Sequence, residues 1–462
     1  MPTKELFSQT DRKGLQDTFK FGGGANTIFA FGDVVVVVDP EIEDFTLESP
    51  YGYIINGGGG NDTIYGSDYT GPPDTSNGGI PDPEFVLETA TGDLLIGGDG
   101  SDTVIGGAGD DTIYGGNLDG SDKGKGKGGV PTNILVGDGE RVDDEDPATA
   151  DPLSADVNFL NGLDFTGGDD VLNGANASTN NMYGDAVNVT MVAGLTFYGG
   201  NDTLNGGDGS TNNMYGDADD VNMVAGSVFN GGGDTLTGGD GSTLNSIFGD
   251  ADDVTMVAGS TFDGGDDSLT GGDGSTNLMF GDADRLTIAA GSTFNGGDDT
   301  LRAGDGGSNT MVGDANIVTP GDGNINGGDD TLFSGTGNDT MVGDWANIDI
   351  GFTGTVTRGD DTFVFAQNFG FDSIGDFEVG SDTINLFATE LTLFSDLDSN
   401  RDSILDGDDL GVTIVVNPIT NVSTTQIDFG VVTGETFQGF LTISGVTGLM
   451  ATDFDFTTDL FV

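Results

Sequence analysis

Two nine-residue units stand back to back in the chain, and their polar groups are oxygen donors in a fixed order. Residues 97–105 read GGDGSDTVI and residues 106–114 read GGAGDDTIY, so both follow the pattern G-G-x-G-x-D-x-U-x, in which U is apolar. The glycines allow the positive φ angles of a tight turn that aims carbonyl oxygens inward, and the aspartate adds a carboxylate. Calcium is a hard cation that takes about six to eight oxygen ligands. The two units therefore predict calcium-binding turns.

A third unit of this kind, GGGGNDTIY, occupies residues 57–65. We expect each unit to form one short strand, whose apolar U residue, such as Val104 or Ile113, points into a narrow core. The predicted metal ligands of the three units are Gly57, Gly59, Asp62, Gly97, Asp99, Asp102, Gly106, Ala108 and Asp111.

The composition agrees with a fold that holds cations inside. The 462 residues include 78 Asp and Glu but only 12 Lys and Arg, which gives a net charge of −66, and such self-repulsion opposes a compact state. Yet 35% of the residues are hydrophobic and 30 are Phe, which is too apolar for a simple disordered acidic chain. The alternative, a solvated acidic surface of the halophile type, does not explain why the acids recur beside glycine.

Several function classes are excluded by the residues that the sequence lacks. It contains no Cys and no His, which excludes disulfides, thiolate and H-E-x-x-H metal sites, and Ser-His-Asp triads. A polyanion of this strength is not expected to bind nucleic acid, and no run approaches the ~18 apolar residues of a membrane span. The first residues lack a basic segment followed by an apolar one, so we expect no Sec-type signal peptide.

A longer repeat follows the nonapeptides. Between about residues 165 and 350, the dipeptide Gly-Asp recurs at 184, 216, 249, 281, 313 and 343, in steps of 30 to 33 residues, which is typical of a stacked array. The apolar positions in one unit, residues 199–229, predict four short strands, interpreted as two coils per repeat, with three strands as the alternative. The predicted metal ligands here and just beyond are Asp202, Asp208, Asp217, Asp234, Asp240, Asp250, Asp267, Asp273, Asp282, Asp299, Asp330, Asp339, Asp344 and Asp361.

The repeat departs from the nonapeptide in two ways. Asparagine often replaces the signature aspartate, as at Asn212, and one extra residue lengthens the turn, so calcium ligation is expected to be weaker there. The second half of each repeat, such as residues 252–262, lacks the glycine-rich turn altogether. It is interpreted as a coil closed without calcium or, alternatively, as a repeated face for self-association.

A second kind of calcium site is predicted at residues 398–409, DSNRDSILDGDD. On a twelve-residue EF-hand loop, the side chains at positions 1, 3, 5, 9 and 12 and the carbonyl at position 7 are the ligands. The sequence resembles the dockerin-type variant, although Ser403 stands where such loops have glycine, and a solvated acidic loop is the alternative. The predicted ligands are Asp398, Asn400, Asp402, Ile404, Asp406 and Asp409.

Three features together resemble the RTX, or haemolysin-type calcium-binding, family: the nonapeptides, the segment D-x-F-x-F…G-x-D-x-I-x-D-F…G-x-D-x-I-x-L at residues 361–386, and the acidic-then-apolar terminus at residues 459–462. The resemblance implies an all-β fold, a parallel β-roll or β-solenoid that binds multiple Ca²⁺ ions. It also implies type I secretion through an uncleaved C-terminal signal, with the secretion machinery as a partner and an extracellular or cell-surface location.

We expect four regions: an N-terminal β cap (1–50), a first β-roll section with nonapeptides and irregular loops (51–164), the array (165–350), and a C-terminal β-rich cap with the EF-hand-like loop and secretion signal (351–462). A Lys-Gly stretch, with Lys123, Lys125 and Lys127, is interpreted as a flexible loop or as a contact arm for an acidic neighbour.

Nearly the whole chain is repeat or cap, which favours a non-enzymatic structural protein that self-associates into a surface layer, filament or matrix. Two alternatives are kept. One is a polysaccharide-active enzyme with an RTX tail, since paired carboxylates serve glycosidases. The other is an ice- or glycan-binding adhesin module, since Thr63, Thr103, Thr112, Thr203 and Thr235 follow the signature position and are able to form an outer row. Ordinary β propensity explains the same threonines.

Overall fold

The computed structural model describes residues 17–20, 27–31, 34–38, 45–48, 53–59, 63–65, 93–107, 110–117, 130–138, 156–158, 164–319, 321–348, 352–389, 391–434 and 439–457. The chain divides into two units, Met1–Leu236 with Asp250–Asp253, and Thr237–Gly249 with Val254–Val462. Each unit is a parallel β-solenoid, which confirms the predicted fold class. The Lys-Gly stretch and the terminus at 459–462 lie outside the described residues, and the predicted region boundaries stay predictions.

Four sheets run along the first unit, with neighbouring strands in the following orders. Sheet A holds β1 (Asp17–Lys20), β5 (Tyr53–Gly59), β7 (Leu94–Asp99), β9 (Thr112–Tyr114), β13 (Val171–Asn173), β17 (Thr203–Asn205) and β21 (Thr235–Thr237); sheet B holds β4 (Phe45–Glu48), β3 (Val34–Val38), β2 (Thr27–Phe31), β6 (Thr63–Tyr65), β8 (Thr103–Ile105), β10 (Thr132–Val136), β14 (Thr179–Tyr183) and β18 (Thr211–Tyr215); sheet C holds β11 (Asp156–Asn158), β15 (Ala186–Thr190) and β19 (Ala218–Asn222); sheet D holds β12 (Phe165–Thr166), β16 (Thr196–Tyr198) and β20 (Val228–Asn230).

The second unit repeats this arrangement, and β23 (Ala251–Met256) has residues in both units. Its sheet A holds β25 (Ser268–Thr270), β29 (Thr300–Arg302), β33 (Thr331–Phe333), β37 (Thr362–Ala366), β39 (Thr383–Ala388) and β43 (Phe454–Asp455); sheet B holds β22 (Leu244–Phe248), β26 (Thr276–Phe280), β30 (Ser308–Val312), β34 (Thr340–Val342), β38 (Phe371–Ile374), β42 (Phe440–Ser444), β41 (Ser423–Asp428) and β40 (Val412–Val416); sheet C holds β27 (Ala283–Ile288), β31 (Ala315–Thr319) and β35 (Trp345–Ile348); sheet D holds β24 (Thr261–Asp263), β28 (Thr293–Asn295), β32 (Asn324–Asn326) and β36 (Thr355–Thr357).

The length of one coil changes along the chain. At the nonapeptides, Leu95 of β7 lies opposite Ile113 of β9, and successive coils are 18 residues apart. In the array, Leu172 of β13 lies opposite Leu204 of β17, and successive coils are 32 residues apart. Each 32-residue repeat contains four strands, as predicted, but the expected two coils per repeat are wrong: each repeat forms one coil, because every strand pairs with the strand four elements later.

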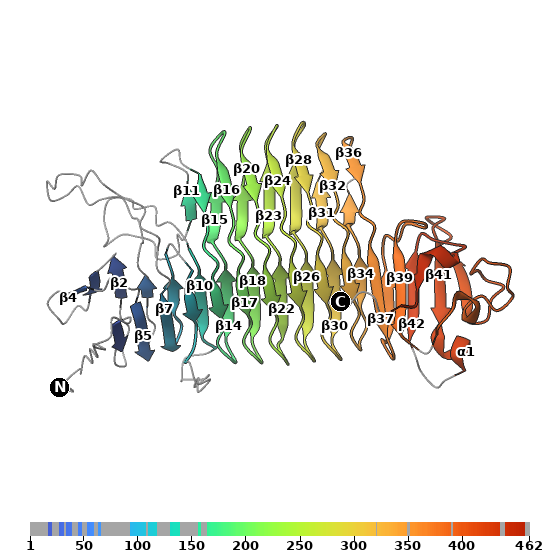
Figure 1. The fold of residues 1–462 in the computed structure, drawn as a ribbon, viewed down its shortest axis with the longest axis horizontal. Helices are drawn as coiled ribbons and strands as arrows, with labels where there is room; N and C mark the ends of the chain where they lie inside the picture. Colours follow the sequence, from blue (N-terminus) through green and yellow to red (C-terminus); the bar gives the residue numbers. More distant parts are fainter. Residues whose placement is uncertain are drawn as a thin grey trace. The chain divides into compact units, whose positions relative to one another are not determined.

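The additional residues of the longer coil form a second lobe. Where a nonapeptide turns directly from Gly106 to Asp111, the array inserts two strands between Gly184 and Asp202, namely β15 and β16. Figure 1 shows β16 and β20 in one row, with β14 and β18 in the row beneath them. We call sheets A and B the inner lobe and sheets C and D the outer lobe.

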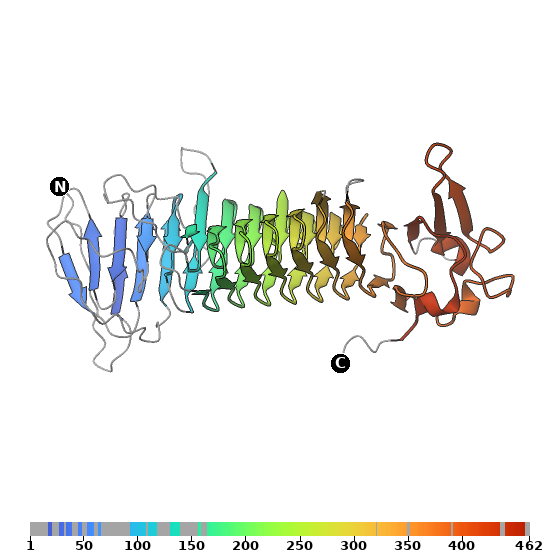
Figure 2. The same cartoon turned by 90° about the horizontal axis from the view of Figure 1, so that it is seen from above.

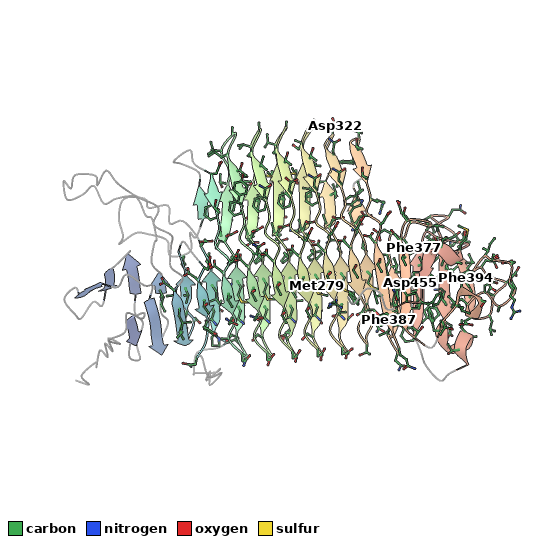
Figure 3. All side chains as sticks on the ribbon, in the orientation of Figure 1. Met279, Asp322, Phe377, Phe387, Phe394 and Asp455 are labelled. Carbon is green, nitrogen blue, oxygen red and sulfur yellow. The ribbon has the colours of Figure 1, made fainter. Side chains whose placement is uncertain are left out.

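Each lobe has its own apolar core, because side chains alternate between the two faces of every strand. In the first unit, the buried side chains include Leu204 and Met214 in the inner lobe and Phe229 in the outer lobe. Phe197 stacks on Phe229 with ring centroids 4.7 Å apart, so identical side chains pack on one another from coil to coil. In the second unit, Figure 3 labels Met279 on β26, in the inner lobe.

Antiparallel strands extend sheet B in both units. In the first unit, β2 pairs with β3 in antiparallel fashion and with β6 in parallel, so the strands expected in the N-terminal cap extend sheet B. In the second unit, β42 pairs in parallel with β38 and continues into the antiparallel strands β41 and β40. The short elements here are η1 (Phe394–Asp396), α1 (Phe429–Thr433) and η2 (Ala451–Asp453). Figure 2 shows the preceding coils, in yellow to orange, as successive layers.

Truncating a stacked phenylalanine tests the outer-lobe core. Phe294 is fully buried on β28 and stacks on Phe262 at 5.2 Å. We expect Phe294→Ala to lower the free energy of unfolding by about 3–5 kcal/mol, because the cavity forfeits both burial and stacking. Urea unfolding in saturating calcium, followed by circular dichroism, measures the loss. Thr293→Ala is the control, since Thr293 points outward on the same strand, and equal losses for both variants contradict the two-lobe core.

Candidate metal centre

Three rows of polar side chains run along the coils, and each row is defined by its place in the sequence. The signature row precedes the strands of sheet A, the Gly-Asp row follows the strands of sheet B, and the asparagine row lies at the start of the strands of sheet B. The signature row comprises Asp93, Asp111, Asp170, Asp202 and Asp234 in the first unit and Asp267, Asp299, Asp330, Asp361 and Asp382 in the second; the Gly-Asp row comprises Asp138, Asp185, Asp217 and Asp250, then Asp282, Asp314, Asp344 and Asp376; the asparagine row comprises Asp102, Asn133, Asn180 and Asn212, then Asn245, Asn277, Asn309, Asp339 and Asp372.

Within each unit, carboxylates of the signature row accept a backbone hydrogen bond from the preceding coil. Asp170 donates its N–H to Oδ1 of Asp202 at 2.7 Å, and in the second unit Asp299 donates to Oδ1 of Asp330 at 2.7 Å. These side chains are at most 1% exposed. The other oxygen, Oδ2, of Asp170, Asp202, Asp299 and Asp330 has no hydrogen-bond partner. A buried, unpartnered carboxylate oxygen is costly unless a cation contacts it.

The unpartnered oxygens point to places where main-chain oxygens also gather. A Cβ atom on Gly184 would lie only 1.9 Å from Asp202 Oδ2 and 1.7 Å from the carbonyl oxygen of Gly216. In the second unit, a Cβ on Gly281 would lie 1.9 Å from Asp299 Oδ2 and 1.8 Å from the carbonyl oxygen of Gly313. Glycine is required at both positions because these oxygens fill the space of a side chain.

The donor set fits calcium. Within the described residues, no group of three or more acidic side chains is arranged to hold one metal ion. The converging oxygens are instead a carboxylate from one coil and a carbonyl from the next, a mixture that a hard cation accepts. Bound calcium would supply the positive charge that these carboxylates lack.

Burial and mutual repulsion raise the pKa values of the signature row. Burial raises the pKa of Asp299 well above its ordinary value, and the charges of Asp282 and Asp330 raise it further. Burial, followed by the charge of Asp344, raises the pKa of Asp361 to about 9. Two carboxylates about 4 Å apart repel by roughly 4 kcal/mol at an effective dielectric near 20. Without cations, the folded chain therefore favours protonated carboxyls.

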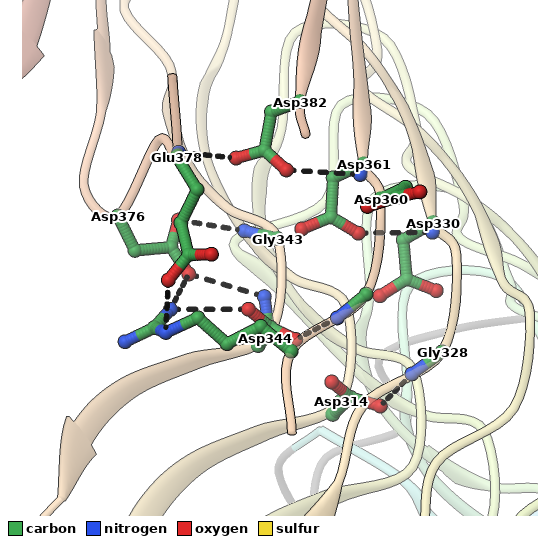
Figure 4. Close-up of polar contacts among 12 residues, drawn as sticks. Asp314, Gly328, Asp330, Gly343, Asp344, Asp360, Asp361, Asp376, Glu378 and Asp382 are labelled. Carbon is green, nitrogen blue, oxygen red and sulfur yellow. Dashed lines mark hydrogen bonds and ion pairs between the residues drawn. The ribbon is translucent and has the colours of Figure 1, made fainter. Parts of the chain in front are cut away.

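The Gly-Asp row lies where the chain leaves the inner lobe for the outer lobe. Oδ1 of Asp314 accepts the N–H of Gly328 at 3.0 Å, as Figure 4 shows. Burial raises the pKa of Asp314 well above its ordinary value, and the charge of Asp330 is the next cause. The signature and Gly-Asp rows therefore act on each other electrostatically, and the outer lobe buries both.

The asparagine row is satisfied by the protein itself. In the second unit, Asn245 Nδ2 donates to Asn277 Oδ1 at 2.7 Å, and Asn277 Nδ2 donates to Asn309 Oδ1 at 2.6 Å. Asn277 also bonds both the N–H and the carbonyl of Gly272, each at 3.1 Å. Asn212 makes the same pair of bonds to Gly207 in the first unit. This neutral amide ladder closes the lengthened turn without a cation, which is why asparagine replaces aspartate there.

The remaining predicted ligands lie in several environments. Asp208, Asp240 and Asp273 are exposed at the lengthened turns, and Asp273 Oδ1 accepts the N–H of Asp305 at 2.8 Å. Gly106 is surrounded by oxygens in the same way as Gly184, since a Cβ on Gly106 would lie 2.1 Å from Asp111 Oδ2. Gly57, Gly59, Gly97 and Asp99 lie in or beside strands of sheet A, while Asp62 and Ala108 lie outside the described residues. All of these stay predictions as ligands.

In the loop at residues 398–409, the first and last aspartates accept backbone N–H groups of the loop. Asp398 Oδ2 accepts the N–H of Ser403 at 2.9 Å, and Asp409 Oδ2 accepts the N–H of Asp406 at 3.0 Å. Asp398 and Asp409 are nearly buried. Ser403 has φ of 75°, so it adopts the left-handed conformation for which glycine is usual. The other predicted ligands, Asn400, Asp402 and Ile404, lie in this exposed stretch of loop.

Sequence reasoning missed Arg358, which contacts one row, and eight aspartates of the rows, namely Asp93, Asp138, Asp170, Asp185, Asp314, Asp372, Asp376 and Asp382. The Gly-Asp dipeptides at 184 and 313 were recognised as a period, and that period was the signal for Asp185 and Asp314. Asp170 follows Gly-Gly-Asp as Asp299 and Asp330 do. Nothing in the sequence pattern marked Arg358.

The asparagine ladder is tested by removing one amide. We expect Asn277→Ala to lower the free energy of unfolding by at least about 3 kcal/mol, because buried polar groups of Gly272 and of two neighbouring asparagines lose their hydrogen-bond partner. The loss should persist in saturating calcium, measured by urea unfolding. The matched control is Asn326→Ala, since Asn326 donates to Asn295 at 2.7 Å in a half-buried ladder on sheet D. A loss that calcium repairs contradicts a metal-independent row.

The raised pKa values predict the pH dependence of the calcium-free protein. The pKa rises from 3.8 to about 7 in Asp344, about 8 in Asp372 and about 9 in Asp361, with burial as the first cause in each. The folded state then binds more protons than the unfolded state, so its stability is present at low pH and is lost as pH rises through these values. In calcium-free buffer, thermal unfolding should show a cooperative transition at about pH 5, and this transition should move to lower temperature and disappear as the pH rises toward about 8.5. Saturating calcium should remove this difference, and a calcium-free Tm that rises with pH would contradict the assignment.

The comparisons with known proteins agree with this chemistry. A family model described as the RTX calcium-binding nonapeptide repeat matches four copies, at residues 54–68, 89–121 and 326–347. None of the curated proteins matches the chain. Among the described residues, no helix is long and apolar enough to cross a membrane. RTX repeats bind calcium and are typical of secreted proteins. The chain therefore carries RTX calcium-binding nonapeptide repeats, which supports an RTX-repeat protein.

Proposed function

We propose that this chain is a secreted structural protein that folds when calcium enters its carboxylate rows, and that then associates with copies of itself. The observation that carries the proposal is the signature row, whose buried Oδ2 atoms lie beside carbonyl oxygens of the next coil and have no protein partner at Asp202, Asp299 and Asp330. Calcium that binds only the folded state stabilises it by mass action. Low calcium inside the cell keeps the chain open for export by a type I system, and higher calcium outside folds it.

Self-association is supported by the regularity of the outer surface. In the second unit, Thr261 and Thr293 lie opposite each other on sheet D, followed by Asn324 and Thr355, so each coil offers the same outward position to a partner. A repeated lateral face suits a surface layer, filament or matrix. We propose no catalysis, because the buried carboxylates recur from coil to coil and are engaged in the rows.

An ice- or glycan-binding module is the second candidate. Thr300, Thr331, Thr362 and Thr383 lie in register on sheet A of the second unit, and they form a partly exposed row of hydroxyl and methyl groups. Such a row supports adsorption to a regular surface as well as lateral association.

Calcium removal tests the proposal. We expect the β-sheet signal in circular dichroism to collapse at neutral pH in chelator, to return with calcium, and to respond less to magnesium, which keeps its waters. Sedimentation velocity should show oligomers only in calcium. An unchanged spectrum in chelator contradicts calcium-driven folding, and a strictly monomeric folded protein contradicts self-association. Thermal hysteresis from such a monomer would favour the second candidate.

A matched pair of variants assigns the effect to the signature row. Asp299→Asn keeps an oxygen for the N–H of Asp267 but removes a buried charge, and we expect it to raise the calcium midpoint of folding several-fold. Asp298→Asn removes an equal charge from the exposed neighbouring residue and should leave the midpoint unchanged. Equal shifts for both would indicate a general charge effect.

A further inference from the structure

A second set of oxygens, from the Gly-Asp row, converges over Gly296 and Gly327. A Cβ on Gly296 would lie 1.6 Å from Asp314 Oδ1 and 2.9 Å from Asp282 Oδ2. A Cβ on Gly327 would lie 2.1 Å from Asp344 Oδ1 and 2.8 Å from Asp314 Oδ2. Two successive carboxylates of the Gly-Asp row therefore meet over one glycine in each coil. We call each such place a slot.

The first unit repeats the slot. A Cβ on Gly199 would lie 1.8 Å from Asp217 Oδ1, and burial, followed by the charges of Asp202 and Asp217, raises the pKa of Asp185. A Cβ on Gly167 would lie 1.8 Å from Asp185 Oδ1. Asp185 and Asp217 are fully buried, so these carboxylates face each other away from water.

Arg358 stands in the coil at the position of a slot glycine. The residue after it, Gly359, donates its N–H to Asp344 Oδ1 at 2.8 Å. Gly328, which follows the slot glycine Gly327, donates in the same way to Asp314 Oδ1 at 3.0 Å. The Arg358 side chain is therefore placed where the other coils leave room for two carboxylate oxygens.

The guanidinium of Arg358 contacts two successive members of the Gly-Asp row. Nη1 lies 3.0 Å from Asp344 Oδ2 and 3.2 Å from Asp376 Oδ2, and Nε lies 3.1 Å from Glu378 Oε1. Figure 4 shows Asp344, Asp376 and Glu378, with dashed lines for these contacts. A positive charge thus bridges Asp344 to Asp376, as a cation would bridge Asp282 to Asp314.

The slots over Gly296 and Gly327 contain paired carboxylates, but they have glycine at the position that Arg358 occupies in the other coil. Asp314 contributes to the slots over Gly296 and Gly327; it is fully buried, and its Oδ2 has no hydrogen-bond partner. An ionised buried carboxylate needs an opposite charge or a metal ion. Charge-bearing oxygens with no nitrogen or sulfur donors favour a hard divalent cation.

We propose that the Gly-Asp row is a second row of divalent-cation sites, distinct from the signature row, and that Arg358 replaces the cation between Asp344 and Asp376. The inference rests on the proposed function, since the cation is the calcium that folds the chain.

Replacing Arg358 by the residue of the other coils tests the proposal. Native mass spectrometry of the full chain in calcium should show one more bound calcium for Arg358→Gly than for the wild type. Arg358→Lys keeps the charge and should leave the number unchanged. An equal number for wild type and Arg358→Gly would overturn the proposal, since a proton shared by the two carboxylates would then suffice.

The reverse substitution keeps the test decisive if Arg358→Gly does not fold. Gly296→Arg places a guanidinium in the slot between Asp282 and Asp314, and it should reduce the bound calcium by one. Asp314→Asn removes a ligand from two slots and should reduce the number by one or two, whereas the exposed control Asp298→Asn should not change it. Unchanged numbers in both slot variants overturn the proposal. A wild type that binds no calcium refutes the proposed function instead.

Discussion

The repulsion among buried aspartates is the constraint on which the rest of this structure depends. Most side chains of both carboxylate rows are almost wholly out of water, and burial, followed by the charge of Asp330, raises the pKa of Asp314. A coil closes over such groups only when protons, cations or an arginine neutralise them. Folding, calcium and pH are therefore coupled through the same few side chains in every repeat.

The glycines follow from this constraint. At Gly184 and Gly296, carboxylate oxygens occupy the volume that a Cβ would need, so the absent side chain makes room for the ligands of a cation. The turn glycines with positive φ, such as Gly209 and Gly274, have open space around them and serve the backbone alone. Glycine thus has two separate roles in one repeat, and only the first concerns the metal sites.

The asparagine row solves the same problem by another route. Asn212 and Asn277 replace charge with a chain of amide hydrogen bonds, so neutral groups close the turns that lead into these strands of sheet B, whereas buried carboxylates precede the strands of sheet A. The ladder meets aspartates at Asp102 in the first unit and at Asp339 in the second, beside the segments in which the nonapeptide pattern is strictest.

The sequence by itself determined the all-β solenoid, the calcium chemistry and four strands per repeat, because glycine spacing and alternating apolar residues act locally. It did not determine that Leu172 pairs with Leu204, or that the four strands form one coil. Register between coils depends on contacts 32 residues apart, which a local pattern does not contain. For the same reason, only the tertiary structure showed that Asp344, Arg358 and Asp376 meet, since folding alone brings successive coils together and removes water from between their charges.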